Sequence, residues 1–125
     1  MAITPLQPEG RQLIQTYGGG AFTIAGVRHS GSVLVFPAET RPWPVTAFTE
    51  ITAEMLQPVV DAGAEVEFLI VGAGLAAARL PDPLRDAFRN VGVTVEVMDT
   101  GAAARTFNVL MMEDRRLAAA LIAVP

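Results

Sequence analysis

The sequence VTVEVMDTGAAARTFNVLMMEDRR, residues 93–116, predicts a β-strand that leads directly into a helix. Residues 93–97 alternate between valine and the polar residues Thr94 and Glu96, which is typical of a strand. The strand ends at Asp99-Thr100, and apolar residues over 102–113 then recur with helical spacing. This arrangement places polar side chains at a strand–helix junction, where α/β proteins usually bind ligands.

The elements around this stretch predict crossover units on a sheet. Residues 65–71 form a strand, and a helix begins at Asp82-Pro83 and ends at Gly92. Residues 117–124 are a continuous apolar run, which predicts a strand buried on both faces. Alternatively, this last strand lies at a sheet edge and pairs with another copy of the chain.

The first half of the chain is less regular. We expect residues 1–20 to be loop-like, and a hairpin to follow, formed by strands at 21–28 and 32–36 with a turn at Ser30-Gly31. A short strand at 45–48 and a helix over 52–62, interrupted by Pro58, complete this half. The prediction is one α/β domain over residues 1–125, with an N-terminal hairpin followed by β-α-β-α-β.

Composition excludes several classes of protein. The chain is 51% hydrophobic and has a net charge of −4, with nine basic residues that are all arginine, so it lacks the basic surface of a general nucleic-acid binder. It contains no cysteine, which excludes disulfides and thiol chemistry. No targeting signal or membrane-length apolar run stands out, so we expect a cytoplasmic protein without an integral membrane segment.

The chain resembles a small α/β family of unknown function that includes a mitochondrial assembly factor for respiratory complex I. The segments that carry the resemblance are residues 20–26, 29–35, 69–74, 98–100, 102–103, 105–110, 113 and 115–116. Two positions depart from the family pattern: Ala73 stands where members tend to have threonine, and Phe107 where they often have tyrosine. The resemblance implies a three-layer α/β sandwich with a mixed sheet, and it implies no established catalytic residues.

The polar corner after residue 98 contains the candidate ligand- or anion-binding residues Asp99, Thr100, Arg105, Thr106 and Asn108. One interpretation is structural: Asp99 or Thr100 caps the helix, and Arg105 pairs with Glu96, Asp99 or Glu113. The other is a site that holds a small anion. Arg105 and Asn108 are spaced i, i+3, so we expect both on one stripe opposite a core-facing stripe of Ala103, Ala104, Phe107, Leu110 and Met111.

Three other features carry less weight. Gly72 and Gly74 fit a loose dinucleotide fingerprint, but the prolines that follow leave little room for the required helix, so we predict a turn and no cofactor. His29 is the only histidine, and a metal site needs further ligands, so we predict no metal. Trp43, between two prolines, is either buried or an exposed anchor for a partner, and we expect burial.

The functional hypothesis is a non-enzymatic protein-binding factor that helps assemble respiratory complex I or another membrane complex, as the family resemblance implies. The partner protein is unidentified, and self-association into a homo-oligomer is compatible with the chain. The alternative is a small-molecule or anion-binding protein, or an enzyme, with its pocket at the corner between Asp99 and Asn108.

Overall fold

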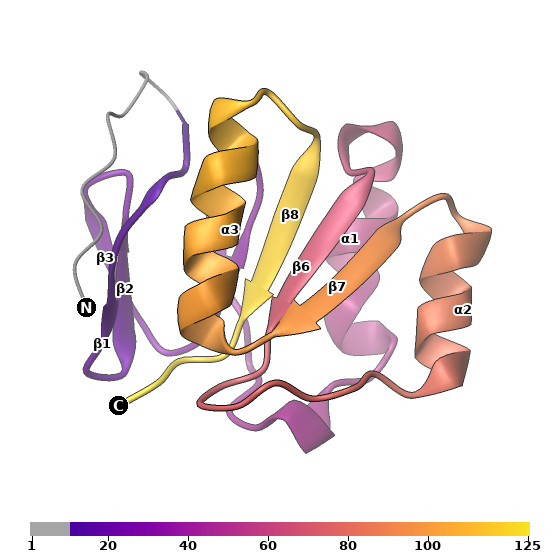
Figure 1. The fold of residues 1–125 in the computed structure, drawn as a ribbon, viewed down its shortest axis with the longest axis horizontal. Helices are drawn as coiled ribbons and strands as arrows, with labels where there is room; N and C mark the ends of the chain where they lie inside the picture. Colours follow the sequence, from indigo (N-terminus) through magenta and orange to yellow (C-terminus); the bar gives the residue numbers. More distant parts are fainter. Residues whose placement is uncertain (1–10) are drawn as a thin grey trace.

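The computed structural model describes residues 11–125 and has an α/β fold with two sheets (Figure 1). Its strands are β1 (Ile14–Gly18), β2 (Ala21–Ile24), β3 (Val27–Ser30), β4 (Val33–Val35), β5 (Thr40–Pro42), β6 (Phe68–Gly72), β7 (Thr94–Met98) and β8 (Leu117–Leu121). Its α-helices are α1 (Gln57–Asp61), α2 (Asp82–Asn90) and α3 (Thr100–Met112), and 3-10 turns span Phe48–Glu50, Glu54–Leu56 and Gly63–Glu65.

The larger sheet is mixed and has β8 at its centre. Its strand order is β5-β4-β8-β6-β7, with β6 parallel to both β7 and β8, and β4 antiparallel to β8. Every residue of β8 is buried, which confirms the prediction of a strand covered on both faces. The alternative of an edge strand is therefore wrong, because β4 and β6 occupy both sides of β8.

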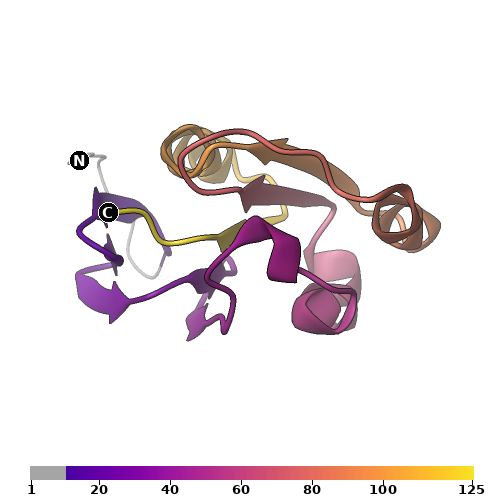
Figure 2. The same ribbon diagram turned by 90° about the horizontal axis from the view of Figure 1, so that it is seen from below.

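Two apolar cores lie on opposite faces of this sheet, which gives the predicted three layers (Figure 2). One face packs against α3 and the smaller sheet, β1-β2-β3. The other face packs against α1, the 3-10 turns and α2. The predicted α/β class and mixed sheet are confirmed, and the strands are divided between two sheets because β1–β3 pair only with one another.

The N-terminal region differs from the prediction. Residues 14–18 form β1, so the expectation of a loop over 1–20 is wrong there, while residues 1–10 lie outside the described part of the chain. The strand predicted over 21–28 is itself a hairpin, because Ala25 and Gly26 both have positive φ and turn the chain between β2 and β3. Val27 consequently lies 56% exposed on β3.

The predicted pairing across Ser30-Gly31 is also wrong. β3 pairs with β2, whereas β4 belongs to the larger sheet and pairs with β5 and β8. Gly31 has φ +82° and redirects the chain from one sheet to the other. The hydroxyl of Ser32 accepts a hydrogen bond from the Ala123 N–H at 3.0 Å, which ties this crossing to the C-terminal segment.

The middle segment is broken into short turns. The strand expected at 45–48 is absent, and a 3-10 turn begins at Phe48. Pro58 divides the helix expected over 52–62, because it occupies the first turn of the shorter helix α1. Trp43 is buried, as expected, and its Nε1–H donates to the Met55 carbonyl at 2.8 Å.

The last strand is entered through an ion-pair cluster. Arg115 and Arg116, which follow α3, both pair with Glu67, the residue before β6. Desolvation raises the pKa of Glu67, but hydrogen bonds from Arg115 and Arg116 outweigh it, so the pKa lies below its ordinary value.

Candidate functional site at the carboxyl ends of the parallel strands

The carboxyl ends of the neighbouring strands β6 and β7 form the topological switch point of the sheet. The connection that follows β6 contains α2, which packs on one face, whereas α3 packs on the other face and precedes β8. Open α/β sheets usually bind ligands in the crevice at such a point. The residues after β6 and β7 are therefore the first place to look for a functional site.

Thr100, the first residue of α3, fills this crevice. Its side chain is fully buried, and its Oγ1 donates to the Ile122 carbonyl at 2.7 Å and accepts from the Gly74 N–H at 3.0 Å. Its own N–H donates to the Gly74 carbonyl at 2.8 Å. The hydroxyl predicted to bind a ligand thus connects the turn after β6 to the segment after β8.

Gly72 and Gly74 serve the same junction. A Cβ at Gly72 would lie 2.9 Å from the Leu121 Cδ2 and 3.0 Å from the Thr100 Cα, so a side chain here would force its neighbours to shift. Gly74 has φ +99° and turns the chain away from the sheet. Helix α2 begins only at Asp82, so the N–H groups of this glycine turn do not form the helix N-terminus that a dinucleotide pyrophosphate requires.

Asp99 caps α3, as the structural interpretation predicts. Its Oδ1 accepts a hydrogen bond from the Ala102 N–H at 2.8 Å, so the carboxylate satisfies one of the backbone donors that have no partner within the helix.

Asn108 joins α3 to the smaller sheet. Its Oδ1 accepts from the Ile14 N–H and its Nδ2 donates to the Ile14 carbonyl, both at 2.8 Å. Asn108 is 5% exposed, so the expectation that it lies opposite the core-facing stripe is wrong. The amide substitutes for a neighbouring strand, because it pairs with both backbone groups of one residue of β1.

Arg105 also faces β1. Its Nη1 donates to the Tyr17 hydroxyl at 2.7 Å, and among the described residues it forms no ion pair with the expected partners Glu96, Asp99 and Glu113. The same tyrosine packs against Gly101, where a Cβ would lie 2.8 Å from its hydroxyl oxygen. Arg105 itself is exposed on the surface of α3.

The five candidate residues therefore do not share one pocket. Asp99 and Thr100 lie at the sheet ends, Arg105 and Asn108 contact β1, and the helical repeat of 100° per residue places Thr106 on the other flank of α3. Thr106 is partly exposed. Binding of a ligand by these residues stays a prediction.

Ile14 and Tyr17, the partners of Asn108 and Arg105, lie within residues 1–20, where a loop was expected. The segment I14-Q-T-Y-G18 alternates apolar and polar residues and precedes the Gly18–Gly20 run, which together are signals of a strand entering a hairpin. Two prolines in the preceding residues favoured a loop over this signal.

Among residues 11–125, no group of histidine, aspartate and glutamate side chains has a geometry that would hold a metal ion. No helix within the same range is both long and apolar enough to cross a membrane.

Comparison with known proteins places this fold in a family. Residues 14–122 match the family described as "Protein of unknown function (DUF498/DUF598)". The chain is 38% identical to NADH dehydrogenase (ubiquinone) 1 alpha subcomplex assembly factor 3 of Xenopus tropicalis, over 96% of this chain and 67% of that protein.

Solved structures resemble the fold closely. A Bartonella henselae protein described as an outer membrane protein has a TM-score of 0.87 and 38% identity, covering 93% of this chain and 98% of that one. A Bordetella pertussis protein described as a Mth938-like domain has a TM-score of 0.84 and 29% identity, covering 98% of this chain and 92% of that one.

Replacing Thr100 by valine tests its role at the strand ends. We expect Thr100→Val to lower the free energy of unfolding by about 1–3 kcal/mol, because the Ile122 carbonyl and Gly74 N–H lose their buried partner. Urea denaturation measures the change. Thr106→Val in the same helix is the control, since Thr106 forms no side-chain hydrogen bond with the described residues; equal losses in the two variants would contradict this role.

Replacing Asn108 by alanine tests the link to β1. Asn108→Ala should lower the free energy of unfolding by about 2–4 kcal/mol, because the N–H and C=O of Ile14 both become unpaired in a buried site. Asn90→Ala, at the exposed end of α2, is the matched control and should change stability by less than about 0.5 kcal/mol. A loss below that level for Asn108→Ala would show that the bidentate contact contributes little.

Proposed function

Because this chain belongs to the DUF498/DUF598 family of proteins of unknown function, we propose that it is a non-enzymatic protein-binding factor. Its role in this proposal is to assist the assembly of respiratory complex I or of another membrane-bound complex. The observation that carries the proposal is the 38% sequence identity with a complex I assembly factor over 96% of this chain.

The candidate corner supports a binding role more than a catalytic one. The hydroxyl of Thr100, the carboxylate of Asp99 and the amide of Asn108 all form hydrogen bonds within the fold. Nucleophilic catalysis requires a free nucleophile beside a base, whereas these three groups are engaged in contacts inside the fold.

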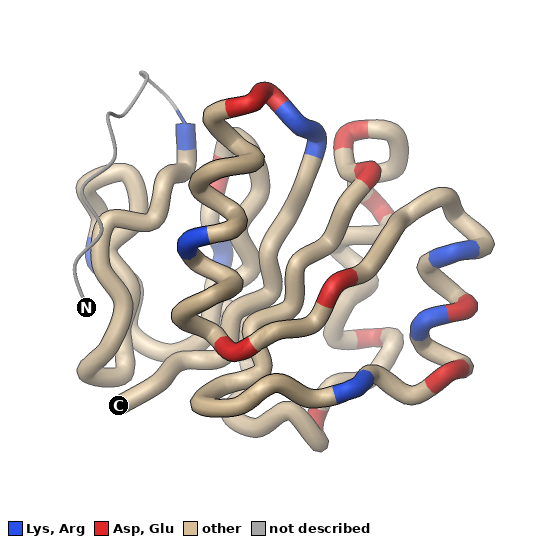
Figure 3. Tube along the Cα trace, in the orientation of Figure 1, with Lys and Arg blue, Asp and Glu red and all other residues tan. Residues whose placement is uncertain are grey.

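The distribution of charge favours protein partners over nucleic acid. Arginine and acidic residues are interspersed along α2 and in the turn between α3 and β8 (Figure 3). A nucleic-acid binder would present a continuous basic surface instead. A single domain over residues 1–125 and a cytoplasmic location are further parts of the proposal, although one structural relative is described as an outer membrane protein.

A second candidate function is the binding of a small anion by Arg105. Its guanidinium is exposed near the start of α3 and bonds among the described residues only to Tyr17, through Nη1. The remaining guanidinium N–H groups have the geometry to bind a carboxylate or phosphate.

Removal of the gene tests the assembly role. Deleting it from its own host should reduce fully assembled complex I, or another membrane complex, severalfold, because unprotected intermediates aggregate or are degraded. Native gel electrophoresis with mass spectrometry of the membrane complexes measures the change. Re-expression of the wild-type chain is the control, and unchanged levels of every membrane complex would contradict the proposal.

Ligand screening tests the anion-binding alternative. If Arg105 binds phosphate or a dicarboxylate, saturation to about 100 times the dissociation constant should stabilise the fold by about 2.7 kcal/mol, measured as a rise in melting temperature. Arg105→Ala should abolish the rise, whereas Arg79→Ala, on the exposed loop before α2, should retain it. A flat response for the wild type removes this alternative.

A further inference from the structure

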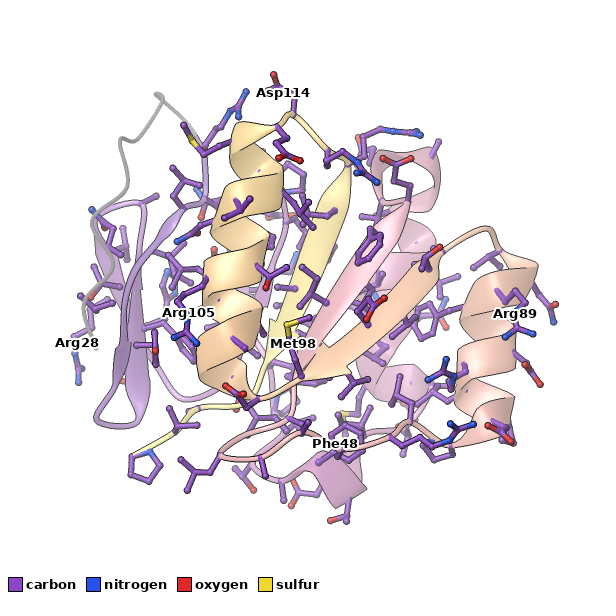
Figure 4. All side chains as sticks on the ribbon, viewed as in Figure 1. Arg28, Phe48, Arg89, Met98, Arg105 and Asp114 are labelled. Atoms are coloured by element: carbon purple, nitrogen blue, oxygen red, sulfur yellow. The ribbon has the colours of Figure 1, made fainter. Side chains whose placement is uncertain are left out.

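One face of the larger sheet is left partly open beside α3 (Figure 4). Helix α3 packs over β8 and β6, and the α3-facing side chains of β7 extend beyond it. Thr94 and Glu96 are exposed there, and Met98 and Phe68 are only partly buried. We call the surface formed by these four residues the open face.

An uncovered face is unusual for parallel strands, which are normally covered on both sides. The opposite side of the same strand obeys this rule, because Val93, Val95 and Val97 pack into the core that contains α2. The layer of α3 therefore lacks a second element over β7. A helix packed beside α3 is the element that would complete this layer.

The open face is bordered by α3 on one side and, at the edge of the sheet beyond β7, by α2. The helical repeat places Thr106, Leu110 and Glu113 on the flank of α3 that faces away from β1. On the other side, Arg85 and Arg89 of α2 line a pocket of about 130 Å³ together with residues 93–95. The open face itself is apolar at Phe68 and Met98 and carries one carboxylate, that of Glu96.

Charges on this surface lack internal partners. Among the described residues, Glu96, Glu113 and Arg85 form no ion pair, whereas Glu67 at the nearby start of β6 pairs with two arginines. An exposed carboxylate within an apolar surface favours a partner that brings an apolar stripe together with a cation.

We propose that the open face is the docking surface for an amphipathic helix of a partner protein. The apolar stripe of that helix packs on Phe68 and Met98, and a lysine or arginine beside the stripe pairs with Glu96. This inference rests on the proposed protein-binding function and assigns its surface. A second copy of the chain is not the occupant, because a two-fold contact through this surface would bring the two Glu96 carboxylates together.

Designed helical peptides provide the probe. Two fluorescent peptides of about 18 residues share one leucine stripe, and its flanking positions are all lysine in one and all glutamate in the other. Fluorescence anisotropy should show that the wild type binds the lysine peptide and not the glutamate peptide. Glu96→Lys should lower the affinity for the lysine peptide by about tenfold or more, and the variant should bind the glutamate peptide.

Two variants separate this surface from general electrostatics. Glu54→Lys makes the same charge change in an exposed turn of the segment that packs on the opposite face of the sheet, and it should keep the affinity for the lysine peptide within about twofold. Glu96→Gln removes the charge with little change in shape. Its affinity for the lysine peptide should lie between those of the wild type and Glu96→Lys. Circular dichroism and melting temperature confirm that each variant is folded.

Several results would overturn the inference. These are no binding of the lysine peptide to the wild type, equal weakening by Glu54→Lys and Glu96→Lys, or a wild-type dimer in sedimentation that Glu96→Lys dissociates. The gene deletion separates this inference from the proposed function. If the peptides do not bind but the deletion reduces complex I, only the proposed docking surface is wrong. If the lysine peptide binds specifically but the deletion leaves every membrane complex unchanged, only the proposed assembly role is wrong.

Discussion

The buried hydroxyl of Thr100 holds together the three segments that meet at the carboxyl ends of the parallel strands. It donates to the carbonyl after β8 and accepts from the turn after β6, while its own N–H returns to the same turn. Because Gly72 has no side chain, helix α3 can start directly against β6 and β8. The crevice that other α/β proteins use for ligands is occupied here by the protein's own side chain.

The second constraint is the amide of Asn108, which attaches the smaller sheet. A three-stranded sheet of short strands has little stability alone, and this one packs its apolar residues against α3. Asn108 satisfies both backbone groups of Ile14 at the place where β1 meets the helix. Nearer the surface, the hydrogen bond between Arg105 and Tyr17 joins α3 to the same strand, β1. These polar residues of α3 therefore connect the helix to the smaller sheet.

These internal contacts change which surface has functional interest. One flank of α3 is used for the smaller sheet, and its other flank borders the exposed side of β7. Glu96 and Thr94 are solvent-exposed on a strand whose opposite side is packed. A surface that combines apolar residues with unpaired charges is the kind of surface that the proposed protein-binding function requires.

The sequence alone predicted the second half of the fold well. Periodicity located β6, α2, β7, α3 and β8, since two-residue and 3.6-residue repeats are local signals. The apolar run at 117–124 favoured a strand covered on both faces but left an edge strand as the alternative, which the structure excludes. Asp99 was recognisable as a cap because its partner lies three residues away. Only the tertiary structure showed that β1–β3 form a separate sheet, that Asn108 points inward and that Thr106 lies apart from Arg105. Strand pairing and side-chain hydrogen bonds between residues 88 to 94 positions apart depend on how the layers pack, and no local pattern encodes that packing.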